Sequence, residues 1–184
     1  MINFCLDDKE KNILKSLIGK KLTYTKHDPF DRFGGAMVYG RVELFFGDLV
    51  VLIDYDYSPY HLFGSEDDDH PKFAVKEISD DEAVSALQGV RQIRVNCDEQ
   101  ISGITLVEDY AKVEWDGKRD DVRTLIAIII KFANRELTIQ GDYMIPLLNL
   151  LKGENTKKQL PKPGEEFAND SKTKYAAKRF YIDV

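Results

Sequence analysis

Apolar side chains recur at every second position over much of the chain, and this period predicts β-strands. Val42, Leu44 and Phe46 alternate up to a Gly47-Asp48 pair, and an apolar run at residues 49–53 follows. Two strand patterns separated by a Gly-Asp pair predict a β-hairpin.

The same pattern returns in the second half of the chain. The remaining predicted strands are residues 21–24, 73–75, 90–95, 104–115, 122–132 and 136–139. Asp116-Gly117 and Ala133-Asn134 mark the turns between the last three strands, and residues 27–35 and 59–71 carry the loop residues that predict exposed connections.

Three short stretches have a helical pattern instead. A capping box at Asp7 and Glu10 begins the first, which ends at Gly19, and Ser79-Asp80-Asp81-Glu82 begins the second, which ends at Gly89. Pro146, followed by four leucines and Gly153, predicts the third. We therefore expect an α+β fold, mainly antiparallel, with about three short helices. The βαβ alternation of nucleotide-binding folds is missing.

A shift of 86 residues superposes part of the chain on itself. Phe46, Ile53, Asp56 and Tyr57 then fall on Phe132, Ile139, Asp142 and Tyr143. Two related β-meander units, residues 20–60 and 104–146, explain the match as a duplication. A second explanation stays open, because any two hairpins share alternating apolar positions.

The composition changes after residue 151. Residues 1–151 predict a single α+β domain, whereas residues 152–184 begin with a polar stretch whose large apolar side chains are Leu160 and Phe167. We expect this stretch to be a linker, or a strap laid over the domain. Tyr175, Phe180 and Tyr181 give the C-terminal segment something to bury, so we expect it to dock.

Composition narrows the class of protein. The 184 residues contain 26 Lys and Arg and 32 Asp and Glu, a formal net charge of −6, which argues against binding to nucleic acid and to anionic membranes. No apolar run is long enough to span a bilayer, and no signal-peptide pattern is present at the first residues. Cys5 and Cys97 stand alone, so we expect idle thiols and a cytoplasmic protein.

The acidic charge is concentrated in the middle of the chain. Residues 54–82 contain ten Asp and Glu and two lysines, whereas residues 152–184 contain eight Lys and Arg and five acids. The densest mixture of acids, phenols and imidazole is at residues 54–61. On a strand, Asp54 and Asp56 would project to one face and Tyr55 and Tyr57 to the other.

We predict a binding surface in this region, because tyrosines supply contact area and acids select a cationic partner. Its candidate residues are Asp54, Tyr55, Asp56, Tyr57, Tyr60, His61, Asp67, Asp68 and Asp69. The alternative for the acidic run at residues 66–69 is a solvated loop. It lacks the alternating spacing of a calcium loop, so no metal site is predicted.

No catalytic, zinc or phosphate-binding motif is readable, and no cofactor is predicted. The loop at residues 27–35 contains His27, Asp28, Asp31 and Arg32 beside two phenylalanines. It is either a ligand contact or a turn with an internal ion pair.

Three functions stay open. The first is a non-enzymatic, cytoplasmic interaction protein that binds a basic protein, as an inhibitor or antitoxin does. The second is a small-molecule-binding protein or small enzyme with a site between the two β units. The third is an oligomer-forming subunit that uses the apolar residues 125–130 and the leucine-rich stretch near residue 150.

Overall fold

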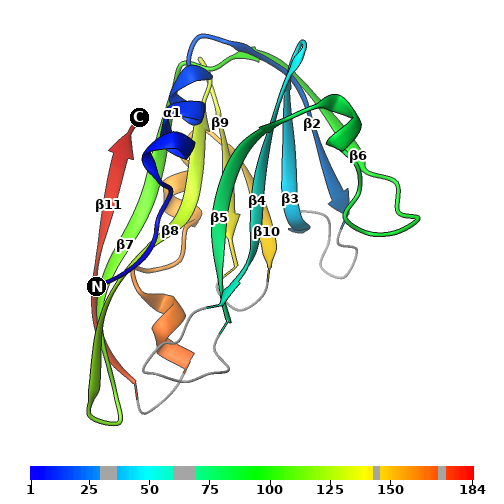
Figure 1. Cartoon of the computed structure of the whole chain (residues 1–184). Coiled ribbons are helices and arrows are strands. Elements are labelled where there is room, and N and C mark those ends of the chain that lie inside the picture. The colour runs from blue at the N-terminus through cyan, green and yellow to red at the C-terminus, as the bar shows by residue number, and fades with distance from the viewer. Residues whose placement is uncertain (30–36, 60–68, 143–145, 170–172) are drawn as a thin grey trace.

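The computed structural model describes residues 1–29, 37–59, 69–142, 146–169 and 173–184. Within these residues the chain forms one α-helix and an eleven-stranded sheet (Figure 1). The elements are β1 (Ile2–Phe4), α1 (Asp8–Ser16), β2 (Lys21–Pro29), β3 (Met37–Phe46), β4 (Leu49–Pro59), β5 (Asp69–Ile78), β6 (Ile93–Gln100), β7 (Gly103–Trp115), β8 (Lys118–Lys131), β9 (Glu136–Gly141), β10 (Leu147–Gly153) and β11 (Lys174–Asp183).

The sheet folds back on itself into two layers. The first layer has the strand order β11-β7-β8-β9-β10, and the second has the order β6-β2-β3-β4-β5. The remaining strand, β1, pairs in parallel with β8 at residues 122–124. Strand β3 joins them, because residues 37–39 pair with β10 and residues 41–46 pair with β4. Gly40 lies at the change, with a φ of +40° and its amide hydrogen-bonded to the Pro146 carbonyl oxygen.

The main core fills the space between the layers. Leu44 and Ile53 of the second layer and Leu106 and Ile128 of the first are fully buried in one cluster. Helix α1 covers one end of the layers, where Leu14 and Leu17 are also fully buried (Figure 1). Alternation along β3 and β4 therefore gives one face of each strand to this core, as the sequence pattern predicts.

Most predicted strands are confirmed. The hairpin at Gly47-Asp48 is β3 and β4, and Asp116 and Gly117 take the positive φ values of a tight turn between β7 and β8. Two predicted loops are partly strand, because β2 continues to Pro29 and β5 begins at Asp69.

Two of the three predicted helices are wrong. The first is α1, and its capping box is present, with Asp7 and Glu10 hydrogen-bonded at 2.8 Å. The second is only a 3-10 turn at Asp80–Glu82, because Ala83 leaves the helical conformation and packs on the sheet.

The third predicted helix is strand β10. Its backbone pairs with β9 from Leu148 to Gly153 and with β3 from Leu147 to Asn149. Leu147 and Leu148 are buried. A run of adjacent leucines fits a strand covered on both faces as well as it fits a helix, and tertiary pairing decides between them.

The two hairpins related by the 86-residue shift have the same pairing register. Val42 pairs with Ile53 and Leu44 with Val51, while Ile128 pairs with Ile139 and Ile130 with Leu137. Hairpins with turns of equal length share such a register whatever their origin. A common ancestry of the two units therefore stays a prediction.

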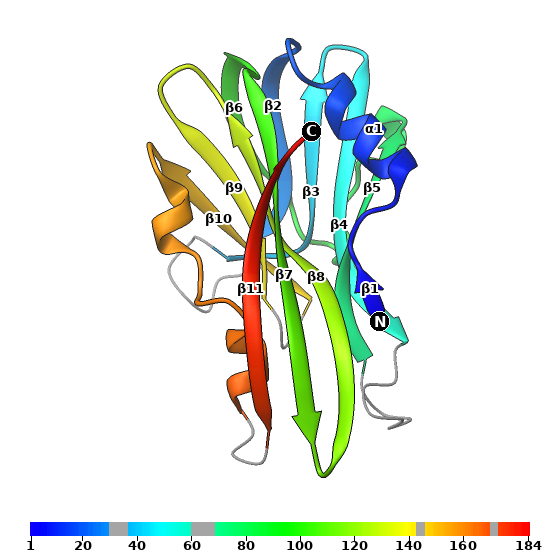
Figure 2. The same cartoon turned by 90° about the vertical axis from the view of Figure 1, so that its left-hand side faces the viewer.

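The C-terminal part lies along the first layer. Residues 154–169 contain two 3-10 turns, and Leu160 packs on the outer face of this layer against Val107 and Ala127. Strand β11 then pairs with β7 along its whole length and forms one margin of the layer (Figure 2). We call residues 154–169 the strap.

Candidate functional site

The predicted acidic and aromatic residues of β4 are divided between two faces of the sheet. Tyr55 points into the core, whereas Asp56 is exposed on the opposite face and Asp54 is half-buried there. Tyr57 shares the face of Tyr55, but it lies near the end of the strand and keeps 43% of its surface exposed. Asp54 and Tyr55 therefore do not form one contact surface.

Tyr55 is a core residue. Its ring lies 4.6 Å from that of Phe73, and its hydroxyl donates a 2.8 Å hydrogen bond to the Asp142 carbonyl oxygen. Burial raises the pKa of this phenol well above its usual value. Tyr55 thus joins the two layers instead of facing a partner.

The two aspartates of β4 face basic neighbours. Asp54 lies opposite Arg41 of the neighbouring strand β3. Burial raises the pKa of Asp54, while the positive charges of Arg41 and Lys76 act in the opposite direction. Asp56 pairs with Lys72 across β5. These bases compensate part of the negative charge that the sequence places on this strand.

Four of the predicted site residues, Tyr60, His61, Asp67 and Asp68, lie outside the described residues. Asp69 is the first residue of β5 and pairs with Pro59. The acidic run is thus described only at its last position.

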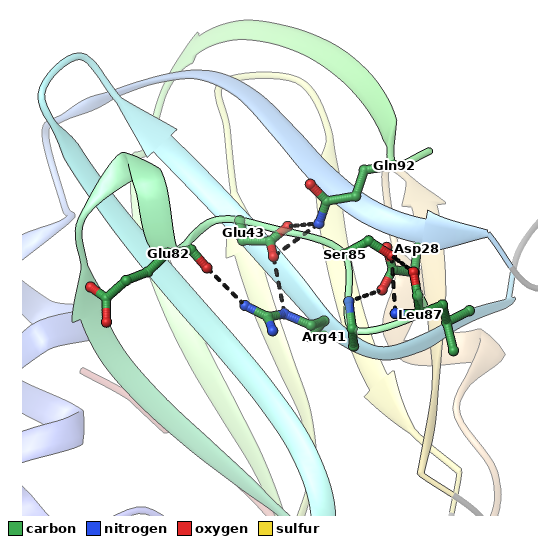
Figure 3. Close-up of polar contacts among 8 residues, drawn as sticks. Asp28, Arg41, Glu43, Glu82, Ser85, Leu87 and Gln92 are labelled. Atoms are coloured by element: carbon green, nitrogen blue, oxygen red, sulfur yellow. Dashed lines mark hydrogen bonds and ion pairs between the residues drawn. The ribbon is translucent and has the colours of Figure 1, made fainter. Parts of the chain in front are cut away.

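A different acidic region is well defined on the outer face of the second layer. Residues 79–92, which we call the covering segment, run across this face between β5 and β6 (Figures 1 and 3). Ala83 is buried against Phe45 of β3 and Val50 of β4. The segment has little regular structure, so side chains of the sheet have to hold it.

A buried carboxylate on β3 provides the first anchor (Figure 3). Glu43 is fully buried and accepts hydrogen bonds from Arg41 Nε at 3.0 Å and from Gln92 Nε2 at 2.9 Å. Arg41 Nη2 also donates to the Glu82 carbonyl oxygen at 3.5 Å. Burial raises the pKa of Glu43, while Arg41 and Gln92 oppose this shift by stabilising the carboxylate.

Asp28 of β2 provides the second anchor. Its side chain is fully buried, and Oδ2 accepts a 2.7 Å hydrogen bond from the Ala86 amide. Ser85 and Leu87 close a small turn beside it through their own hydrogen bonds (Figure 3). Asp28 therefore holds the covering segment at Ala86 and Glu43 holds it at Gln92, while Arg41 links Glu43 to the Glu82 carbonyl oxygen.

The acids of the covering segment itself stay exposed. Asp80, Asp81 and Glu82 all face solvent, as does Glu77 just before them, and Val84 keeps 56% of its surface exposed. Glu82 accepts hydrogen bonds from Ser79, which lower its carboxyl pKa, so it is ionised at neutral pH. Residues 77–84 therefore form an exposed acidic turn, which we call the acidic turn, on the outer face of the second layer.

A small cavity lies where the two β units meet. Tyr55 and Gly141 line it together with His70 of β5 and Glu166 of the strap, and its volume is about 20 Å³. Burial and the nearby Asp109 raise the pKa of Glu166 to about 8. This volume has room for about one water molecule, which is too little for a substrate.

Two larger hollows are open surface depressions. One, of about 450 Å³, lies among Lys112, Glu114 and Lys174 on β7 and β11, and the other, of about 520 Å³, surrounds residues 131–136. None of the predicted site residues lines either of them.

The remaining chemistry in the described ranges is limited. No three His, Cys, Asp or Glu side chains there come together as they would around a metal ion. Burial raises the pKa of the Cys5 thiol to about 12, so Cys5 stays a neutral thiol at neutral pH. Among the described helices, α1 included, none has the length and apolar character required to cross a bilayer.

The chain matches no protein-family model, no curated protein and no solved structure. What the site does has to follow from its own residues.

The sequence pattern did not identify Glu43 and Asp28 as anchors of the covering segment. Glu43 is a charged residue between Val42 and Leu44, which read as an ordinary alternating strand with a polar outer face. Asp28 falls within the predicted loop at residues 27–35, although it lies on strand β2. The signal for both is weak, because an acid on an outer sheet face is common, and only the covering segment makes these two buried.

Proposed function

We propose that this protein is a non-enzymatic interaction protein that presents an acidic surface to a basic protein partner, in the manner of an inhibitor or antitoxin. The acidic turn at residues 77–84 is the contact surface that we assign to this role. One observation carries the proposal: buried carboxylates hold the covering segment on the sheet while its own carboxylates remain exposed.

The physical advantage of this arrangement is preorganisation. A turn that is already ordered loses less conformational entropy on binding than a free loop does. Its exposed carboxylates also attract a cationic partner over about a Debye length, which speeds association at low salt. Val84, which is exposed at the end of the charged turn, adds an apolar contact.

The small-molecule alternative has weaker support. The junction between the two β units gathers Tyr55, His70 and Glu166, but the cavity there is only about 20 Å³. The oligomer hypothesis also has weaker support, since residues 125–130, one of the two stretches on which it rests, are buried within the protein.

A titration with a ten-residue oligolysine peptide tests the proposed function. Amide chemical shifts of residues 77–84 should move at 20 mM salt and return towards their free values at 500 mM salt, because salt screens the attraction. The Asp80→Lys/Asp81→Lys variant should weaken binding at least tenfold.

The matched control is Asp48→Lys/Glu154→Lys, which changes the net charge equally at two exposed acids elsewhere. Its effect should be no more than twofold. Equal loss in both variants, or shifts spread evenly over the surface, would show attraction to net charge alone and would contradict the proposal.

A further inference from the structure

Four strands in the described part of the sheet pair on one side only, namely β1, which has just three residues, and the longer strands β5, β6 and β11. A free edge exposes unpaired amides and carbonyls, so it can pair with another chain, and proteins block such edges by several devices. At β5 the block is helix α1, whose Glu10 accepts a 3.0 Å hydrogen bond from the Val75 amide. At β6 it is irregularity, since its pairing with β2 shifts register and Asp98 has a φ of +63°.

Strand β11 carries neither device. It pairs with β7 in one uninterrupted register from Lys174 opposite Glu114 to Asp183 opposite Thr105, and it contains no proline. Over the ranges that the structure covers, its backbone makes strand hydrogen bonds with β7 alone. Tyr175, Phe180 and Tyr181 are 40%, 48% and 46% exposed along it.

We propose that two copies of this chain pair through β11, antiparallel, about a two-fold axis at Arg179. A two-fold axis normal to the sheet leaves each side chain on the same face in both copies. One residue of β11 then has to lie directly opposite its own counterpart, with the axis between them. Two positions, Lys178 and Arg179, leave all but one residue of the strand paired. The side chains distinguish these two registers.

An axis at Lys178 would place its ammonium group beside the same group of the second copy, and like charges directly opposite each other are destabilising. An axis at Arg179 instead places Lys178 beside Phe180 of the second copy, an ammonium next to an aromatic ring, twice over. It also sets the small Ala177 beside Tyr181 and the small Ala176 beside Ile182.

The self-contact of Arg179 in this register carries little repulsion. Its guanidinium donates from Nε and Nη2 to the two carboxylate oxygens of Asp109, at 2.7 Å each, and from Nη1 to the Pro161 carbonyl oxygen at 2.6 Å. The positive charge is thus compensated within each copy. The side chains of a second copy therefore complement those along the free edge of β11.

Sedimentation of the full chain over 1–500 μM tests the proposal. The mass should rise with concentration from 21.1 kDa towards twice that value. Phe180→Lys should weaken the dimer at least tenfold, because lysines would then face each other in both halves of the pairing. Adding Lys178→Glu to Phe180→Lys should restore the dimer, since opposite charges then meet in this register.

Tyr57→Lys is the matched control, because it replaces an equally exposed aromatic residue on β4 and should leave the dimer unchanged. Circular dichroism of each variant verifies that the monomer is folded. The proposal is overturned by a monomer at every concentration, by a dimer that Phe180→Lys leaves intact, or by a double variant that stays monomeric.

Discussion

Tyr55 lies across Gly141, the residue 86 positions later in the chain, and its hydroxyl donates to the carbonyl oxygen of the next residue, Asp142, at 2.8 Å. The two positions correspond under the internal shift that relates the two β units. The contact brings β4 of the second layer against the end of β9 in the first. It depends on the missing side chain of Gly141.

The first prediction is that Gly141→Ala destabilises the protein by about 2–3 kcal/mol, because a Cβ there would lie 2.4 Å from Tyr55 Cζ and the ring is enclosed by the core. Urea denaturation measures this loss. The control is Gly103→Ala, where the nearest atom would be 3.7 Å away and the loss should stay below about 1 kcal/mol. Equal losses in the two variants would mean that the ring moves aside freely.

The second prediction concerns the anchors of the covering segment. Glu43→Ala leaves Arg41 and Gln92 without their acceptor and should cost about 2–4 kcal/mol. Amide hydrogen exchange should accelerate in residues 79–92 more than in the rest of the sheet. Glu77→Ala removes an exposed acid nearby and should change the stability by less than about 0.5 kcal/mol.

Should Glu43→Ala leave exchange in the covering segment unchanged, the contact of Ala83 with Phe45 and Val50 would be the sufficient anchor. The acidic turn would then be held by apolar packing alone.

The third prediction concerns the ion pair between β7 and β11. Asp109 and Arg179 form two hydrogen bonds of 2.7 Å and are both buried, and the Gly164 amide of the strap donates to the same carboxylate. Arg179→Lys keeps the charge but loses the two-pronged geometry and the bond to Pro161. We expect a loss of about 2–4 kcal/mol and faster proteolysis within the strap.

Lys112→Ala on the neighbouring strand β7 is the control, since Lys112 is exposed and lies off the free edge of β11. Its denaturation midpoint should stay within the error of the unsubstituted protein. A midpoint shift as large as that of Arg179→Lys would point to the pairing of the two strands instead of the ion pair.

The fourth prediction concerns pH. The pKa of Glu166 rises from 4.5 to about 8 on folding, with burial as the main cause. Between these values the native carboxyl holds a proton that the unfolded chain has released, so the free energy of unfolding decreases as pH rises from about 4.5 to 8. Glu166→Gln should remove this decrease and stabilise the protein at pH 9. The gain should be only about 1–2 kcal/mol, because the carboxyl keeps some contact with solvent, which screens its charge.

Urea denaturation at half-unit steps from pH 4.5 to 9 measures this slope. Glu154→Gln, at an exposed carboxylate of the same strap, is the control and should retain the slope of the unsubstituted protein. Parallel curves for Glu166→Gln and the unsubstituted protein would contradict a proton held at Glu166.

Local patterns were sufficient where the structure depends on neighbours in sequence. The capping box at Asp7 and Glu10, the hairpin turn at Gly47-Asp48 and the turn at Asp116-Gly117 all formed as predicted. They failed where a distant segment competes. The leucine-rich β10 has a place between β9 and β3, and Ala83 gains more from packing on Phe45 than from continuing a helical turn.

The sequence by itself determined most of the strands, the antiparallel class and the acidic middle of the chain, because each follows from residue type and short-range period. Only the tertiary structure decided which carboxylates are buried anchors and which are exposed, since Asp28 and Glu43 become buried through contacts with residues 49 or more positions away. It also decided that Tyr55 is a core residue and that β11 ends the sheet. Burial depends on what covers a residue, and the covering segments come from elsewhere in the chain.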